Sequence, residues 1–125
     1  MIGFVMVGTN DLNKAIKFYD ALLETIDLKR TVTNEKYVGY SSKQKPENVE
    51  FYVTNPVNKL KATFGNGTQI SFIVSSKEIV DKFYNLGIKI GGKDEGAPEV
   101  RSGDYYCYIR DLDGNKICVF AKLDN

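Results

Sequence analysis

A spacing of 65 residues recurs along this chain of 125 residues and limits the folds that it can adopt. The pair Phe18-Tyr19 returns as Phe83-Tyr84, and the same shift carries Val5 onto Ile70. In both halves an apolar, strand-like segment is followed by a helical pattern, which predicts an internal duplication. One helix covers only one face of a small sheet. Each copy therefore needs a partner for its other face, either the second copy or a second chain.

The first module is expected to span about residues 1–55. Its opening residues 2–7 are apolar at successive positions, as expected for a strand that is covered on both faces. Asn10 or Asp11 can cap a helix over residues 11–24, in which apolar side chains recur every three or four positions. Three short strands are expected to follow, at residues 31–33, 37–40 and 49–53.

A connector at about residues 56–66 leads to the second module, at about residues 67–125. A strand is expected at residues 68–74, and Ser75 and Glu78 have the spacing of a capping box for a helix over 77–86, which Gly87 can end. The remaining strands are expected at 88–90, 105–110 and 116–121, with a loop at 96–103 and a hairpin turn at 111–115.

The whole chain, residues 1–125, is expected to form one α+β domain, because a chain of this length can bury a single core. Lys+Arg 17 against Asp+Glu 16 leaves a formal charge of +1, which gives no general attraction to nucleic acid or to an anionic membrane. No apolar run approaches the roughly 18 residues of a membrane-spanning helix. Cys107 and Cys118 lie in apolar segments and are interpreted as reduced thiols of a cytoplasmic protein.

Four segments carry a resemblance to a known family: Val5-Met6-Val7, Ala15 to Tyr19, Gly67 to Phe72, and the most distinctive one, Arg110 to Ile117. Together they resemble the vicinal-oxygen-chelate superfamily, which includes glyoxalase I, bleomycin-resistance proteins and extradiol dioxygenases. The resemblance covers nearly the whole chain, although relatives usually have Pro where this chain has Leu112. It implies two βαβββ modules that form a paired, half-open curved sheet, a ligand cleft between modules, and a homodimer.

Enzymes of this family hold a divalent metal ion with one side chain from the first strand and one from the last strand of each module. Residue matching places these four positions at Phe4, Tyr52, Gln69 and Cys118. A catalytic ion of this kind needs imidazole nitrogens or carboxylate oxygens, whereas Phe4 has no lone pair and the chain has no histidine. We therefore expect no metal ion and no other cofactor.

Strand alternation places one set of side chains on the cleft side of both sheets. If Ile70 and Phe72 face the second helix, Ser71 faces the cleft. The expected lining residues are Phe4, Met6, Glu50, Tyr52, Gln69, Ser71, Tyr106, Tyr108, Cys118 and Phe120, with Arg101 at the cleft mouth.

The last hairpin is expected to pair Arg110 with Lys116. This register sets Tyr106 opposite Phe120 and Tyr108 opposite Cys118. The resulting cleft is aromatic and apolar with a few polar points, which is typical of a small-molecule site.

Three polar residues could act on a ligand in such a cleft, and each also has a structural interpretation. Glu50 could be a general base or a solvated carboxylate at a strand edge. Cys118 could be a nucleophile, but without a histidine to activate it the sequence favours inert packing. Arg101 could neutralise an anionic ligand or be an ordinary surface arginine.

Three functions remain open at this point. The leading hypothesis is a metal-free relative that binds a small aromatic or amphipathic molecule between its modules. The alternative is an enzyme of the superfamily with an atypical site, such as a lactoylglutathione lyase-like protein with Glu50 as its base. The second alternative is a structural or partner-binding domain whose cleft is filled by its own bulky side chains, such as Phe4 and Met6.

Overall fold

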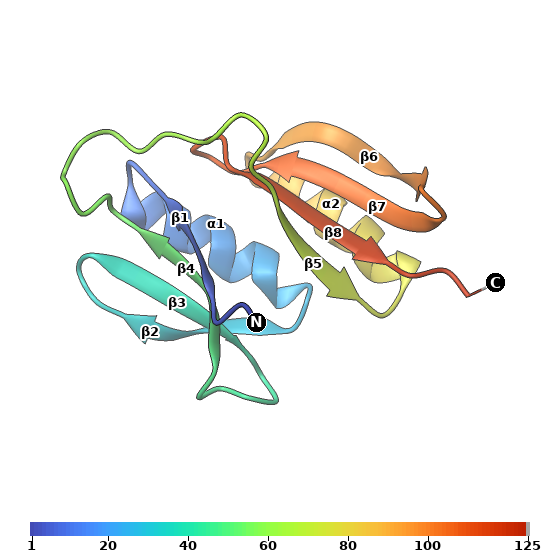
Figure 1. The fold of residues 1–125 in the computed structure, drawn as a ribbon, viewed down its shortest axis with the longest axis horizontal. Helices are drawn as coiled ribbons and strands as arrows, with labels where there is room; N and C mark the ends of the chain where they lie inside the picture. The colour runs from blue at the N-terminus through green and yellow to red at the C-terminus, as the bar shows by residue number, and fades with distance from the viewer. Residues whose placement is uncertain (125) are drawn as a thin grey trace.

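The structure is a computed structural model that describes residues 1–124, and it contains two four-stranded sheets, each with one helix (Figure 1). The first module comprises β1 (Val5–Gly8), α1 (Leu12–Glu24), β2 (Leu28–Thr33), β3 (Tyr37–Ser42) and β4 (Val49–Thr54). The second comprises β5 (Ile70–Val74), α2 (Lys77–Lys89), β6 (Lys93–Arg101), β7 (Asp104–Arg110) and β8 (Lys116–Ala121).

Both sheets have the same topology, with strand orders β1-β4-β3-β2 and β5-β8-β7-β6. The first strand of each module runs parallel to the last, and the other pairs are antiparallel. A helix follows the first strand because a parallel pair needs a crossover connection. The predicted α+β class and the two βαβββ modules are therefore confirmed.

The helix starts follow from short polar side chains that accept a backbone hydrogen bond. Asp11 accepts from the N–H of Lys14 at 3.1 Å, so the first capping prediction is confirmed at one of its two candidates. The second helix is capped by Ser76, which accepts from the N–H of Ile79 at 3.3 Å, and not by Ser75 as predicted. Both serines precede the apolar stripe, but the helix begins at Lys77, so Ser76 has the extended backbone of the N-cap position.

The prediction that Gly87 ends α2 was wrong, and so was the strand expected at 88–90. Gly87 is buried inside the helix, where a Cβ would lie 2.8 Å from the Ile109 side chain, so close packing on β7 explains the glycine. The helix continues to Lys89 and ends before Gly91, which has a φ of +112°.

The loop expected at 96–103 was also wrong, since β6 covers most of it. The pairing of β6 with β7 shifts register between Gly96 and Glu99, which leaves Ala97 and Pro98 in an irregular stretch of an edge strand. Proline lacks an N–H and is tolerated at such places. β1, β2 and β5 begin at Val5, Leu28 and Ile70 instead of at 2, 31 and 68.

In Figure 1 the two sheets lie side by side, and α1 and α2 lie on the same side of them and contact each other. A single hydrophobic core runs between the helices and the sheets and includes residues of both modules. Across the junction, the rings of Phe51 and Phe72 meet edge to face with centroids 5.6 Å apart. None of the helices in residues 1–124 is long and apolar enough to cross a membrane.

A buried polar network also ties the two modules together, between Tyr19 of α1 and the turn that joins β7 and β8. The carboxylate of Asp111, which is 5% exposed, accepts from the Tyr19 hydroxyl at 2.5 Å and from the Asn115 amide at 2.9 Å. The same amide donates to the carbonyl oxygen of Gly8 at 3.0 Å. Burial raises the pKa of Asp111, and the hydrogen bonds that it accepts oppose this shift.

Candidate functional site

The surface of the two sheets that is turned away from α1 and α2 is called here the open face. Strand alternation defines it clearly in β5, where Ile70 and Phe72 pack against the core while Ser71 and Ile73 are exposed. In the first module, Phe4, which directly precedes β1, and Met6, which lies in β1, are 56% and 47% exposed. Within the described residues, nothing in the same chain covers this part of the open face.

Three aromatic rings of the second sheet lie nearly parallel on the open face. The register pairs Arg110 with Lys116 and Tyr106 with Phe120, so the predicted hairpin is confirmed. The Tyr106 and Phe120 rings are 4.9 Å apart and inclined by 15°, and the Tyr106 and Tyr108 rings are 6.1 Å apart and inclined by 5°. All three side chains are half-buried, which leaves part of each ring available to a ligand.

Two cations lie over the ring of Tyr108. The guanidinium of Arg101 is 5.2 Å and the ammonium of Lys116 is 5.0 Å from the ring centroid. Arg101 was expected in a loop, but it ends β6 and donates to the carbonyls of Tyr106 (2.6 Å) and Ala97 (2.8 Å). Lys116 makes no side-chain hydrogen bond or ion pair within residues 1–124, and the sequence analysis did not single it out as a site residue.

The first sheet contributes a second aromatic group to the open face. The Tyr52 ring meets Phe4 at 5.0 Å and Tyr37 at 5.7 Å, both edge to face. A Cβ at Gly39, which pairs with Tyr52, would lie 2.9 Å from the tyrosine ring, so this glycine allows the ring to lie across β3. The sequence analysis did not include Tyr37, although alternation along residues 37–42 would have placed it on the same face as Gly39.

The four positions that match the family's metal ligands do not offer a suitable donor set. Phe4 and Tyr52 pack against each other, and Gln69 donates from its amide to the Ser71 hydroxyl at 2.9 Å. Cys118 is fully buried, and burial raises the pKa of its thiol, which disfavours the thiolate that a metal ion needs. Among residues 1–124 there is no group of three or more His, Cys, Asp or Glu side chains that could hold a metal ion.

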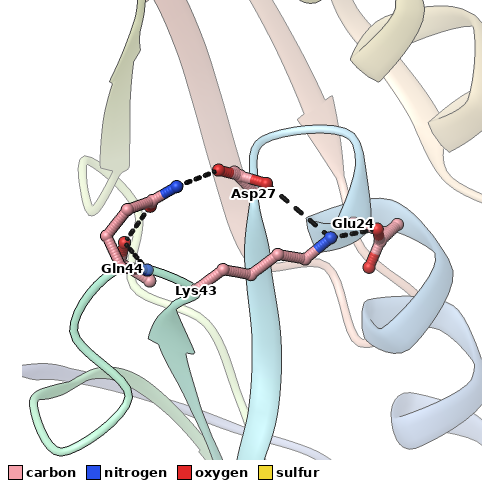
Figure 2. Close-up of polar contacts among 5 residues, drawn as sticks. Glu24, Asp27, Lys43 and Gln44 are labelled. Atoms are coloured by element: carbon pink, nitrogen blue, oxygen red, sulfur yellow. Dashed lines mark hydrogen bonds and ion pairs between the residues drawn. The ribbon is translucent and has the colours of Figure 1, made fainter.

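A pocket of about 330 Å³ lies between the modules and contains two of the predicted residues, Glu50 and Ser71. Its other polar residues, Asp27, Ser42 and Gln44, were not predicted. Asp27 and Gln44 come from turns, and Ser42 from the end of β3, which only the tertiary fold brings to β5. Figure 2 shows how these turns are joined: the Gln44 amide donates to Asp27 at 2.9 Å, and Lys43 forms ion pairs with Asp27 and Glu24. Glu50 has no such cation within the part of the chain that the structure describes.

Fold and site together define a class of α+β protein in which two βαβββ modules present an aromatic sheet face. The model of the Glyoxalase/Bleomycin resistance protein/Dioxygenase superfamily matches residues 1–119, and the chain belongs to this superfamily. A comparison with curated proteins gives no match.

Three solved structures illustrate the likeness. The crystal structure of a glyoxalase/bleomycin resistance protein from Albidiferax ferrireducens T118 is 41% identical, with a TM-score of 0.89 over 98% of this chain and 99% of that chain. The hypothetical protein SA1046 from S. aureus is 25% identical, with a TM-score of 0.73 over 97% and 94%. Lactoylglutathione lyase from Agrobacterium tumefaciens is 19% identical, with a TM-score of 0.69 over 97% and 92%, and shares the fold.

Proposed function

We propose that this protein binds a small aromatic or amphipathic molecule on its open face. The observation that carries the proposal is the set of three nearly parallel, half-buried rings of Tyr106, Tyr108 and Phe120. A planar ligand can stack on or against such rings, and the ammonium of Lys116 and the amide of Gln69 offer polar contacts nearby.

The proposed binding does not use a divalent ion, so the site is a degenerate form of the superfamily's metal site. The support is the chemistry of the four matched positions, which combine a phenyl ring, a phenol, an amide and a buried thiol. None of these supplies the charged oxygen or imidazole nitrogen that would offset the dehydration of a divalent ion.

The binding unit is proposed to be a homodimer. A sheet face can bury only one side of a ligand, whereas small-molecule sites usually bury about 70–90% of the ligand surface. The exposed apolar side chains of Phe4, Met6 and Ile73 lie on the same open face and would be covered by a second copy. Each site would then combine the faces of two modules.

The proposed partner is a small molecule, without nucleic acid or membrane, and the proposed compartment is the cytoplasm. The formal charge of +1 supports the first point because it gives no general attraction to polyanions. The two free cysteines, Cys107 and Cys118, support the second because both remain unpaired.

The proposal is tested by screening planar aromatic compounds for thermal stabilisation of the purified protein, followed by NMR titration of each compound that stabilises it. Replacing Phe120 with Ala should weaken the binding of such compounds. Replacing Ile88, an exposed apolar residue of α2 on the other side of the sheet, with Ala should leave binding unchanged.

Two results would overturn the proposal. One is the absence of any compound whose binding depends on Phe120. The other is a stoichiometric divalent ion in the purified protein together with isomerisation of the hemithioacetal of methylglyoxal and glutathione that Glu50→Gln abolishes, which would establish the lyase-like alternative.

A further inference from the structure

A pocket of about 310 Å³ lies at the end of the first sheet, where β4 passes into the connector. Its walls include Tyr37, Pro56 and Val57. Tyr37 also belongs to the aromatic group of the first sheet, but the three stacked rings of the second sheet do not line this pocket. The volume falls in the range of about 300–1,000 Å³ that is typical of small-molecule sites. The pocket is therefore large enough for a compound of one or two rings.

Backbone hydrogen bonds fix the frame of this pocket. Tyr37 pairs with Thr54 in the register of β3 and β4, and the N–H of Asn55 donates to the carbonyl of Lys36 at 2.9 Å. The N–H of Lys59 donates to the carbonyl of Pro56 at 3.0 Å and closes a turn. Because the backbone on both sides is held, a ligand would not have to order it.

The two charged residues of the pocket are both lysines, Lys36 and Lys59. Neither ammonium lies within 4.0 Å of a carboxylate of the described residues, and neither side chain donates a hydrogen bond to them. Val57, which lines the pocket, is 95% exposed, so an apolar occupant would remove a large apolar side chain from water. Two unpaired cations beside an apolar wall are complementary to a molecule that has both a ring and a negative charge.

We infer that this pocket is a second ligand site, which binds an aromatic carboxylate with its ring between Tyr37 and Val57 and its carboxylate between Lys36 and Lys59. The site is independent of the proposed function because Tyr106, Tyr108 and Phe120, the rings that carry that function, do not line it. Lys59, which the sequence alone would assign to solvated surface charge, becomes a binding residue because the turn of the connector brings it to the same pocket as Lys36.

The experiment is an NMR titration of the full chain with naphthoate and, in parallel, with its uncharged counterpart naphthamide. Naphthoate should shift the amide resonances of residues 54, 55 and 57–59 and bind about tenfold more tightly than naphthamide, since hydrogen bonds to a charged group are the stronger ones. The double variant Lys36→Gln/Lys59→Gln should lose this preference and keep weak binding of both compounds.

Lys61→Gln is the matched control, because Lys61 lies in the same connector but does not line the pocket. Its titration should equal that of the wild type. Equal affinity for naphthoate and naphthamide would overturn the inferred charge preference, and naphthoate shifts confined to residues 106–120 would overturn the site itself. The latter result would still support the proposed function, so the two ideas fail separately.

Discussion

At the scale of single residues, the carboxylate of Asp111 stands out because it accepts hydrogen bonds from both side chains and backbone N–H groups. In addition to Tyr19 and the Asn115 side chain, it accepts from the backbone N–H groups of Asp113 and Asn115, both at 2.9 Å. These bonds hold the last hairpin turn and connect it to α1. The turn therefore has a structural role that explains why Asp, Gly and Asn occur there together.

Removing this carboxylate should destabilise the fold strongly. Asp111→Ala leaves the buried hydroxyl of Tyr19 and the backbone N–H groups of Asp113 and Asn115 without their acceptor, and we expect a loss of about 3 kcal/mol in the free energy of unfolding. Tyr19→Phe removes a single donor and should cost about 1 kcal/mol. Urea unfolding measures both, with the exposed Glu47→Ala as control. A loss at Asp111 no larger than that at Glu47 would contradict the assigned role.

The two cysteines should be unreactive in the folded protein. Both are fully buried, and burial raises the pKa of Cys107 to about 12 and that of Cys118 in the same direction. At pH 8 the thiolate fraction is then too small for attack on a disulfide reagent. We expect no reaction with Ellman's reagent in the native state and two thiols per chain in denaturant. A fast-reacting native thiol would reopen the nucleophile interpretation of Cys118.

At the scale of elements, the α2–β6 connection depends on a close backbone approach at Gly92. A Cβ there would lie 2.7 Å from the carbonyl oxygen of Gly87 and 3.2 Å from that of Arg110. Backbone atoms cannot move away as a side chain can, so Gly92→Ala should cost about 2–3 kcal/mol. Gly3→Ala, where no atom lies within 4 Å, should change the free energy of unfolding by less than about 0.5 kcal/mol. Equal stabilities of the two variants would contradict this packing argument.

The elements that the sequence predicted correctly are those in which local pattern and tertiary contact agree. The alternation of β7 and β8 gave the register of the last hairpin, and the spacing of apolar residues gave both helices. The sequence prediction failed where tertiary packing overrides local preference. Gly87 stays helical because it packs on Ile109, and β6 forms despite Gly96 and Pro98 because β7 pairs with it.

At the scale of the whole molecule, the sequence could not decide how the modules are arranged. The sequence repeat predicts that one face of each sheet is left uncovered by its own helix. It does not predict whether the second module covers that face or lies beside the first module. Within this chain the sheets lie side by side, joined through Phe51, Phe72 and the Asp111 network, and the open face stays exposed. Site residues could thus be assigned to a face from alternation, and a cleft between the modules could be expected. The contribution of Asp27 and Gln44 to the pocket found there could not, because only the tertiary fold brings their turns to β5.

This arrangement leads to a prediction about assembly. If a second copy covers the open face, the wild type should sediment as a dimer at micromolar concentration. A charge on that face should dissociate the dimer, because an unpaired carboxylate would be buried.

Two variants test this prediction. Met6→Asp tests the face of the first module, and Ile73→Asp tests that of the second. Ile88→Asp, an equally drastic change at an exposed residue of α2 on the other side of the sheets, is the control and should remain dimeric. Both open-face variants should be folded monomers with a native circular dichroism spectrum and weakened ligand binding. A wild type that is monomeric over the whole accessible concentration range, or a dimer that tolerates both charges, would show that another surface or another partner covers these sheets.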